Sequence, residues 1–265
     1  MTPKDADFAN RLADAAGAVI RPKFRGNFTA ETKSDASAVT EADRAAEAVM
    51  RKMIEDERPG DGIIGEEYGR HNESAGRQWV LDPIDGTQSF VAGRPIFGTL
   101  IALMQDGWPV LGIIDQPILK ERWVGRIGAG TTLNGAAVKA RSCAGIEGMS
   151  VATTSPHAFD ADQSDAYLNV ITNAYPKRPY PIYGGDCYNY ALLASGHIDL
   201  VMEAQLKLHD YAALVPVVEG AGGIMADWQG NPLDQDSDGT VIALGDPARL
   251  EDVLAAMGSS ETGPG

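Results

Sequence analysis

Apolar residues recur every three or four positions in two segments near the start of the chain, which predicts two amphipathic helices. The first begins at Pro3, a residue suited to the first turn of a helix. Its predicted buried positions are Phe8, Leu12, Ala15 and Val19. The second follows Thr40, which can cap it with Asp43 as the capping-box partner. Its predicted buried positions are Ala46, Val49, Met50 and Met53.

Short apolar runs bounded by turns then predict strands. Ile63-Ile64 and Trp79-Val80-Leu81 each end on acidic residues. From 97 to 124, strand-like stretches alternate with turns such as Asp106-Gly107, which is typical of an antiparallel meander. In the second half, strands are expected at 149–152, 181–183, 198–202 and 223–226, and helices near 160–174, 186–195 and 210–221. This alternation favours a partly parallel α/β unit.

The change of pattern predicts two subdomains. The boundary falls in the polar, small-residue segment 139–148. It separates an N-terminal α+β subdomain for metal and phosphate (1–145) from a C-terminal α/β subdomain for substrate specificity (146–258). Residues 259–265 are rich in Gly, Ser and Thr and are expected to be disordered.

Composition and charge narrow the class of protein. The chain has 265 residues, of which 44% are hydrophobic and 22% charged, as in ordinary globular proteins. A net charge of −15 disfavours nucleic-acid binding, which needs clustered Lys and Arg. The cysteines, Cys143 and Cys187, are too few for a disulfide framework. Neither a signal core nor a membrane-length apolar run is present. We therefore expect a soluble, cytoplasmic protein without nucleic-acid or membrane partners.

The candidate chemistry lies in acidic residues that follow two predicted strands. Gly65-Glu66-Glu67 follows one, and Asp82-Pro83-Ile84-Asp85-Gly86-Thr87 follows the other. Carboxylates at strand ends can converge, and oxygen ligands suit Mg²⁺ rather than zinc. Gly86 allows a close backbone approach, and Thr87 at a helix start leaves N–H groups facing an anion. Taken singly, the first segment is also typical of a solvated surface and Asp85-Gly86 of a turn. Together they predict a phosphate site with metal ions.

Three segments together resemble the inositol monophosphatase-like superfamily, and the resemblance extends from about residue 8 to 255. They are Gly65-Glu66-Glu67, the hexapeptide Asp82–Thr87 within residues 79–90, and His209-Asp210-Tyr211-Ala212-Ala213 with Glu219-Gly220-Ala221-Gly222-Gly223 downstream. The resemblance implies an α+β fold, a layered αβαβα sandwich of the inositol monophosphatase and fructose-bisphosphatase type. It also implies a homodimer.

The same resemblance implies two or three Mg²⁺ ions per active site and in-line attack of a metal-activated water on phosphorus. The implied metal ligands are Glu66, Asp82, the Ile84 carbonyl, Asp85 and Asp210. The implied catalytic residues are Thr87, which holds the water, Asp43, which orients the Thr87 hydroxyl, and Glu66. The implied substrate contacts are Gly86, Thr87, Asp85, Asp186, Glu203 and Asp210. Asp210 also suits the N-cap of the expected helix 210–221.

Two further carboxylates indicate the leaving group. Asp186 stands where inositol phosphatases typically carry a small residue, and Glu203 matches an acidic residue of the family. Both have structural alternatives, Asp186 as a helix cap and Glu203 as an exposed strand end. A pair of carboxylates suits a cationic leaving group better than a neutral polyol. Segments 113–117, 121–123 and 213–219 are most similar to the histidinol-phosphatase branch. His209 replaces a tryptophan common in the family, and we favour packing over substrate contact for it.

We therefore predict an Mg²⁺-dependent phosphomonoesterase that hydrolyses L-histidinol phosphate to L-histidinol and phosphate, a step of histidine biosynthesis. The first alternative is an inositol-1-phosphate or broad sugar-phosphate phosphatase. A 3′-phosphonucleotide or fructose-bisphosphate phosphatase is less favoured, because neither needs the extra carboxylate. A non-catalytic regulatory protein of the same fold is the alternative from another class, and the complete set of implied ligands argues against it.

Overall fold

The computed structural model of the protein describes residues 3–26, 30–32, 38–175 and 180–258. The α-helices in these residues are α1 (Pro3–Ile20), α2 (Glu41–Glu57), α3 (Thr87–Val91), α4 (Ala161–Ala174), α5 (Asp186–Ala194), α6 (Leu208–Tyr211), α7 (Leu214–Gly220) and α8 (Leu250–Gly258). Short 3₁₀ helices cover Pro156–Ala158 and Pro247–Arg249.

The described strands form three sheets. The larger sheet contains β3 (Gly62–Gly65), β4 (Gly69–His71), β5 (Arg77–Asp85), β6 (Gly98–Gln105), β7 (Trp108–Gln116), β8 (Glu121–Arg126), β9 (Gly130–Leu133) and β10 (Ala136–Val138). The smaller sheet contains β11 (Val151–Thr153), β12 (Ile182–Tyr183), β13 (Leu200–Glu203), β14 (Ile224–Ala226) and β15 (Val241–Leu244). β1 (Ala30–Thr32) and β2 (Ala38–Thr40) pair separately.

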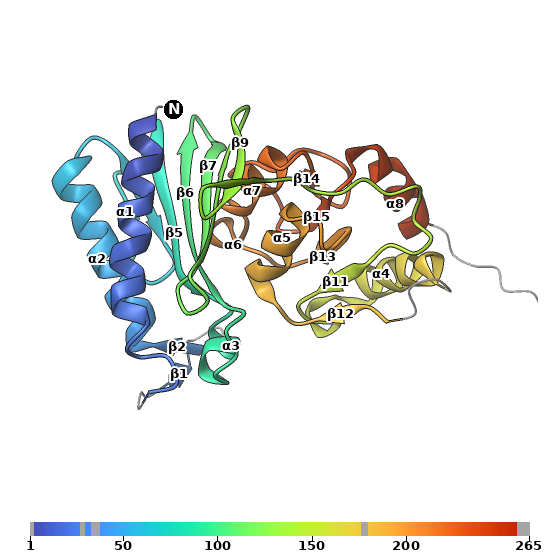
Figure 1. The fold of residues 1–265 in the computed structure, drawn as a ribbon, viewed down its shortest axis with the longest axis horizontal. Coiled ribbons are helices and arrows are strands. Elements are labelled where there is room, and N and C mark those ends of the chain that lie inside the picture. The colour runs from blue at the N-terminus through green and yellow to red at the C-terminus, as the bar shows by residue number, and fades with distance from the viewer. Residues whose placement is uncertain (1–2, 27–29, 33–37, 176–179, 259–265) are drawn as a thin grey trace, which may run out of the picture.

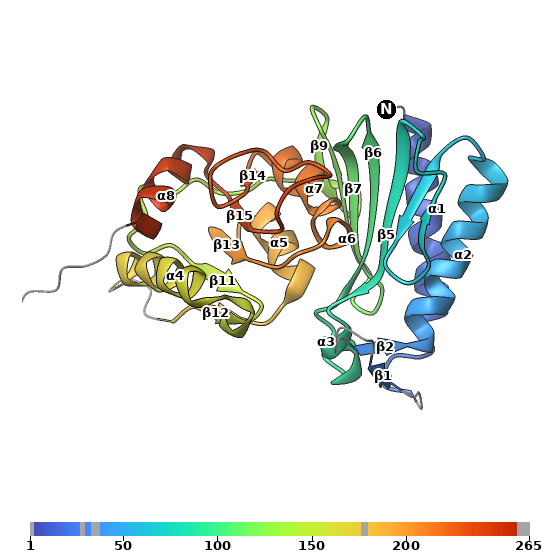
Figure 2. The same ribbon diagram turned by 180° about the vertical axis from the view of Figure 1, so that it is seen from behind.

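Helices and sheets alternate in five layers (Figure 1). Helices α1 and α2 cover the outer face of the larger sheet, and α5, α6 and α7 lie between the two sheets. Helices α4 and α8 pack together on the far side of the smaller sheet, as the reverse view shows (Figure 2). The predicted α+β fold, a layered αβαβα sandwich, is confirmed.

The first two helices form where the periodicity predicts them. The buried stripe of α1 consists of Phe8, Ala9, Leu12, Ala13, Ala16 and Ile20. Ala15 and Val19, expected to be buried, lie at the half-buried edge of that stripe. Val49 and Met53 of α2 are likewise half-buried, whereas Ala46 and Met50 are buried as expected. The side chain of Thr40, the expected cap of α2, lies outside the described residues.

The larger sheet is the predicted meander, with strand order β10-β9-β8-β7-β6-β5-β3-β4. Its strands pair antiparallel except for β3 and β5, which are parallel and bring Gly65 opposite Leu81. The pairing of β5 with β6 shifts register between Asp82 and Asp85. Pro83 explains this irregularity, because proline has no N–H for the ladder. The regular pairing of β5 with β6 is therefore interrupted between Asp82 and Asp85, where the acidic residues lie.

The smaller sheet confirms the partly parallel unit and adds a strand that the pattern analysis missed. Strand β11 pairs parallel with both β12 and β13. The missed strand β15 pairs antiparallel with β13 and β14, between which it lies. Its apolar sequence between Gly239 and Gly245 is the signal that could have predicted it. Helix α8 was also not predicted.

The expected helix at 210–221 is wrong, because the chain forms two short helices, α6 and α7, in this region. Pro216 gives the physical reason. In a continuous helix it would lie in the interior, where it lacks the N–H that bonds one turn back and its ring clashes with that turn. In the observed arrangement Pro216 lies in the first turn of α7, where no such bond is needed.

The core between the two sheets is shared by both halves of the chain. Val80 and Leu100 of the larger sheet belong to the same buried cluster as Tyr190, Val201 and Leu214. The segment 139–148 connects β10 to β11, and the division into two subdomains stays a prediction. The expected disordered tail, 259–265, lies outside the described residues. Among the described helices, none combines the length and hydrophobicity that a membrane span requires.

Candidate active site

The parallel pair β3–β5 brings two acidic segments to one edge of the larger sheet. Glu66 follows the last residue of β3, and its N–H donates to the Leu81 carbonyl at 3.1 Å. The next residue on β5 is Asp82, so both carboxylates start from neighbouring backbone positions. Their side chains interact, and contact with Glu66 is among the causes that raise the pKa of Asp82. The expected convergence of carboxylates at the strand ends is thus observed.

A carboxylate from another part of the chain completes the cluster. Asp82, Asp85 and Asp210 each offer one carboxylate oxygen, and these oxygens lie within 4.8 Å of one another. Burial raises the pKa values of Asp82 and Asp85, and the neighbouring carboxylates raise them further. The donors are all oxygens and carry like charge, which fits a hard divalent cation such as Mg²⁺. We call Glu66, Asp82, Asp85 and Asp210 the carboxylate cluster.

The backbone after Asp82 is held by a small set of hydrogen bonds. Ile84 N–H donates to Oδ1 of Asp82 at 3.0 Å, and the Thr87 hydroxyl donates to the Ile84 carbonyl at 3.1 Å. The Thr99 hydroxyl fixes the Pro83 carbonyl at 2.8 Å. These bonds orient Asp82, and they place Thr87 and the Ile84 carbonyl in direct contact. Their implied roles in holding water and metal stay predictions.

Gly86 is required where the loop meets α5. It has φ 83° and ψ 42° and immediately precedes α3, which begins at Thr87 as expected. A Cβ at this position would lie 2.6 Å from Oδ2 of Asp186. Any larger residue would therefore be strained in its backbone and would collide with Asp186. The absent side chain lets α5 approach the carboxylate cluster closely.

The first turn of α5 is joined to the cluster by hydrogen bonds. Cys187 N–H donates to Oδ2 of Asp85 at 2.6 Å, and the Ser89 hydroxyl donates to Oδ2 of Asp186 at 3.2 Å. Burial raises the pKa of Asp186, while Ser89 and Arg94 act in the opposite direction. Gly185, rather than Asp186, is the cap of α5. The helix-cap alternative for Asp186 is therefore wrong.

Glu203 enters the same region from the end of β13. It is only 4% exposed, so the expected alternative of an exposed strand end is wrong. Its carboxylate accepts from Thr154 N–H at 2.7 Å and from the Thr153 hydroxyl at 3.3 Å. Burial nevertheless raises the pKa of Glu203 to about 7. A cavity of about 150 Å³, lined by Glu203, Asp186, Asp85 and Asp210 among others, lies beside the carboxylate cluster; we call it the side pocket.

Asp210 does not cap a helix as expected. It lies inside α6, and its carboxylate accepts from the backbone N–H of Lys207 at 2.6 Å. The neighbouring His209 places Nε2 3.5 Å from Oδ1 of Asp210, and this imidazole lowers the pKa of Asp210 against the effect of burial. His209 therefore contacts a member of the carboxylate cluster, and its relation to substrate stays untested.

Helix α2 contributes two acidic residues one turn apart, Asp43 and Glu47, and both are fully buried. The proposed link from Asp43 to Thr87 stays a prediction. Glu47 was missed by sequence reasoning. Its carboxylate accepts from the N–H groups of Glu67 at 2.7 Å and Tyr68 at 3.1 Å, and thereby fixes the turn after Glu66. Gly65 was the available signal, because a Cβ there would fall within the Glu47 carboxylate.

Known proteins are similar to this chain in sequence and in fold. The chain matches the Inositol monophosphatase family over residues 3–261. It is 50% identical over 240 residues to the bifunctional phosphatase IMPL2, chloroplastic, of Arabidopsis thaliana. The aligned region covers 90% of this chain and 68% of the relative. The histidinol-phosphatase of Chlorobaculum parvum is 35% identical over 263 residues, or 98% of this chain and 99% of the relative.

A solved structure extends the comparison. An inositol monophosphatase from Zymomonas mobilis superposes with a TM-score of 0.87 and 51% identity, covering 96% of this chain and 97% of the other. The fold and the relatives together define a phosphatase. More particularly, the chain belongs to the inositol monophosphatase family.

Proposed function

We propose that the protein is an Mg²⁺-dependent phosphomonoesterase whose substrate is L-histidinol phosphate. The observation that carries this proposal is the placement of Asp186 and Glu203 in the side pocket, directly beside the carboxylate cluster. A phosphate bound to cations at the cluster would extend its leaving group into that pocket. The relative from Chlorobaculum parvum that bears the name histidinol-phosphatase supports the same substrate.

The carboxylate cluster is suited to hold the metal. Glu66, Asp82, Asp85, Asp210 and the Ile84 carbonyl would ligate two or three Mg²⁺ ions. When bound, these ions supply the positive charge that a phosphate dianion needs and an activated water for in-line displacement. The cluster by itself would repel phosphate, which is why a protein of charge −15 requires them.

The remaining residues position the reacting groups. The Thr87 hydroxyl, with Asp43 behind it, would aim the attacking water at phosphorus. The N–H groups of Gly86 and Thr87 would hold non-bridging phosphate oxygens, because the first N–H groups of a helix have no partner within it. Glu66 would accept a proton from the water as its oxygen attacks.

The carboxylates of the side pocket set the preference for a cation. Histidinol carries a primary ammonium near the ester oxygen and an imidazole that is partly protonated near neutral pH. Hydrogen bonds from such groups to Asp186 or Glu203 are charge-assisted and roughly twice as strong as neutral ones. Inositol offers only hydroxyls, so the buried carboxylates would lose hydration without an ionic partner.

A second candidate function is hydrolysis of inositol-1-phosphate. The observation that favours it is the 51% identity to the inositol monophosphatase from Zymomonas mobilis. The name of the Arabidopsis thaliana relative, a bifunctional phosphatase, is also compatible with a broader substrate range.

We further propose a homodimer. Ile182 and Tyr183 form β12, the edge strand of the smaller sheet, and Tyr180 lies just before it; Tyr180, Ile182 and Tyr183 are 86%, 39% and 52% exposed. An exposed apolar edge strand is a natural surface for a second copy. Sedimentation of the purified protein tests this directly, since a monomer at micromolar concentration would contradict it.

Side-by-side kinetics test the substrate. With Mg²⁺, kcat/KM should favour histidinol phosphate over inositol-1-phosphate by at least ~10²-fold, the discrimination expected of a well-placed polar contact. The variant Asp186→Asn should lose most of this preference. Asparagine is the suitable replacement, because Asp186 has φ 44° and asparagine tolerates that conformation. EDTA should abolish all activity. A wild-type protein that prefers inositol-1-phosphate would contradict the proposed substrate and leave the metal-dependent phosphatase intact.

A further inference from the structure

The side pocket contains a polar group that the proposed roles do not use. Tyr190 lies on α5 and is only 2% exposed, and its hydroxyl has no hydrogen-bond partner among the described residues. Buried hydroxyl groups without a partner are rare in proteins, because they lose their bonds to water without replacement. Such a group therefore calls for a ligand-based explanation.

The Tyr190 side chain lies in the wall of the side pocket. Tyr190 lines the side pocket together with Asp186, Glu203 and Leu214. Asp186, at the start of the same helix, borders the pocket as well. The charges that act most on its phenol oxygen are those of Glu203, Asp85 and Asp210, the carboxylates that surround the pocket.

The side pocket is rich in hydrogen-bond acceptors, and the hydroxyl groups in its lining are those of Tyr190, Thr154 and Ser155. Its charged side chains are carboxylates, which accept hydrogen bonds when ionised and cannot donate them. A neutral imidazole has one N–H donor and one nitrogen that needs a donor. The carboxylates can receive the N–H and the ammonium of histidinol, but they leave the second ring nitrogen unsatisfied. The Tyr190 hydroxyl can supply the missing donor.

Apolar side chains complete the lining. Ala158, Ala204 and Leu206 border the same cavity of about 150 Å³. They provide flat apolar surface for an aromatic ring, and they offer nothing to the hydroxyls of a polyol. This lining is typical of ligand pockets, where a few polar groups fix orientation within apolar walls.

We propose that Tyr190 is a specificity residue that donates a hydrogen bond to the imidazole ring of the leaving group. This inference rests on the proposed function, because it assigns a contact within the substrate named there. It also explains why the folded protein retains a buried hydroxyl that binds nothing in the chain itself. The stability lost by burying that group is offset when substrate occupies the pocket.

The variant Tyr190→Phe tests the inference, because it deletes the hydroxyl and keeps the ring. The comparison substrate is phenyl phosphate, an ester that has neither an imidazole nitrogen nor an ammonium group. The ratio of kcat/KM for histidinol phosphate to kcat/KM for phenyl phosphate should fall by about tenfold, as expected for one buried hydrogen bond. The melting temperature should stay equal or rise, since an unsatisfied polar group has been removed.

A matched control is Tyr167→Phe. Tyr167 is a buried tyrosine that packs with Val151 and Phe159 and does not line the side pocket, and its hydroxyl also lacks a hydrogen-bond partner among the described residues. This variant should leave the ratio of the two substrates unchanged. The control separates the loss of a buried hydroxyl in general from the loss of this one.

The possible outcomes distinguish the inference from the function on which it rests. If the wild type prefers histidinol phosphate and Tyr190→Phe keeps the full ratio, the role of Tyr190 is overturned and the proposed function stands. A lowered melting temperature with equal loss on both substrates would show a purely structural role and would also overturn it. If the wild type shows no preference for histidinol phosphate, the proposed substrate is contradicted, and the inference on Tyr190 is contradicted as well.

Discussion

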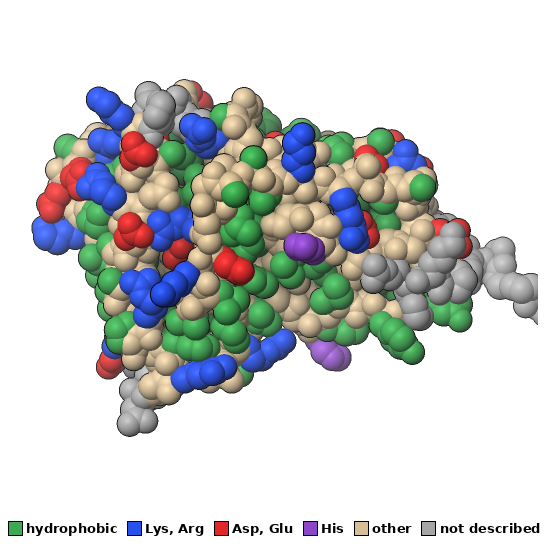
Figure 3. Space-filling model, in the orientation of Figure 1, with side chains coloured by type: hydrophobic (Ala, Val, Ile, Leu, Met, Phe, Trp, Pro, Cys, Tyr) green, Lys and Arg blue, Asp and Glu red, His purple; other side chains and the backbone are tan. Residues whose placement is uncertain are grey.

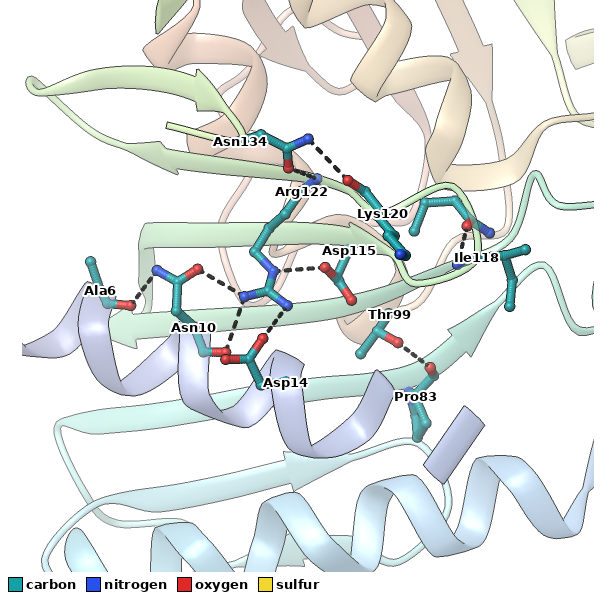
Figure 4. Close-up of polar contacts among 11 residues, drawn as sticks. Ala6, Asn10, Asp14, Pro83, Thr99, Asp115, Ile118, Lys120, Arg122 and Asn134 are labelled. Carbon is teal, nitrogen blue, oxygen red and sulfur yellow. Dashed lines mark hydrogen bonds and ion pairs between the residues drawn. The ribbon is translucent and has the colours of Figure 1, made fainter. Parts of the chain in front are cut away.

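Two clusters of polar side chains in this protein differ in their charge: one gathers like charges and the other pairs opposite charges. The carboxylate cluster brings like charges together, and burial and this repulsion raise the pKa values of Asp82 and Asp85. The second cluster centres on Arg122 and joins α1 to the larger sheet (Figure 4). There the guanidinium donates to Asp115 at 2.6 Å, to Asp14 at 2.8 Å and to Asn10 at 3.2 Å. We call this second cluster the Arg122 network.

This difference in charge distinguishes a structural cluster from a cluster suited to bind a ligand. In the Arg122 network each carboxylate meets the guanidinium, which offsets part of the cost of burying Asp115, and the contacts fix α1 against β7 and β8. The carboxylate cluster contains mutual repulsion and buried charge, which destabilise the folded chain. Such an arrangement persists where a bound ligand restores the balance.

Cavity size alone would have suggested the wrong site. The groove beside the Arg122 network has a volume of about 620 Å³, against about 150 Å³ for the side pocket. Figure 3 shows Lys and Arg side chains interspersed with Asp and Glu over this end of the molecule. The carboxylates of the network are nevertheless paired with the Arg122 guanidinium, although Oδ2 of Asp115 is buried without a hydrogen-bond partner among the described residues. The unbalanced charge lies at the smaller cavity.

The two clusters are connected through β8. Arg122 points toward α1, whereas its neighbours Glu121 and Trp123 face α5, because side chains alternate along a strand. Glu121 accepts from the Tyr188 hydroxyl at 2.6 Å, and Trp123 donates to the Ser195 hydroxyl at 2.9 Å. The segment 121–123, which resembles the histidinol-phosphatase branch, therefore supports the helix that carries Asp186 and Tyr190.

The largest expected effect is on activity, from removing one charge of the carboxylate cluster. Asp82→Asn should lower kcat/KM by at least ~10³-fold, since a bound cation supplies several kcal/mol of transition-state stabilisation. The folded protein should remain intact, and in EDTA its melting temperature should rise because repulsion is relieved. Phosphate-release assays and thermal unfolding measure the two effects. Near-full activity in this variant would refute the metal assignment.

A double-mutant cycle tests the water-positioning pair. Thr87→Ala and Asp43→Asn should each slow kcat by about 10²–10³-fold, as for loss of a positioned catalytic group. The double variant should be little slower than either single variant, because the two residues would act as one unit. Additive losses in kcat would show that they do not.

The Arg122 network should respond in the opposite way, through stability. Arg122→Met should lower the free energy of unfolding by about 2–4 kcal/mol, because it leaves buried Asp115 without its cation. The value of kcat should stay within about twofold of wild type, since the network lies outside the side pocket. Urea unfolding and phosphate release check these outcomes. A variant that loses activity and keeps its stability would contradict the structural role of the Arg122 network.

The smallest expected effect is a dependence of stability on pH. The raised pKa values of Asp82, Asp85 and Asp210 mean that the folded state binds more protons than the unfolded state. Stability without metal is therefore present at acidic pH and lost as pH rises through the folded pKa values. In EDTA the melting temperature should fall as pH rises through about 7, the raised pKa of the neighbouring Glu203, by ~2–4 °C for each kcal/mol. Added Mg²⁺ should reverse the fall, and an EDTA profile that is flat would contradict it.

The sequence was informative where local pattern decides structure. Helical periodicity predicted α1 and α2, and acidic residues after two apolar runs predicted the convergence of Glu66 with Asp82. Their parallel strands place these residues side by side. Pro216 explains the break between α6 and α7, but its effect was overlooked because the apolar pattern continues across it.

Long-range contacts could not be predicted from local pattern. The approach of Asp186 to Gly86 joins positions 100 residues apart in the chain and depends on how the two sheets pack. The burial of Glu203 and the unpartnered Tyr190 hydroxyl follow from the same packing. A carboxylate or a hydroxyl in a sequence does not reveal whether the fold will supply it with a partner.

The central claim is that the carboxylate cluster is kept unbalanced in order to bind divalent cations. Calorimetric titration of EDTA-stripped protein with Mg²⁺ in the presence of phosphate tests it most directly. We expect at least two ions per chain, with binding greatly weakened in Asp82→Asn and unchanged in Arg122→Met. A protein that binds no Mg²⁺, or that binds it equally well after Asp82→Asn, would contradict the claim.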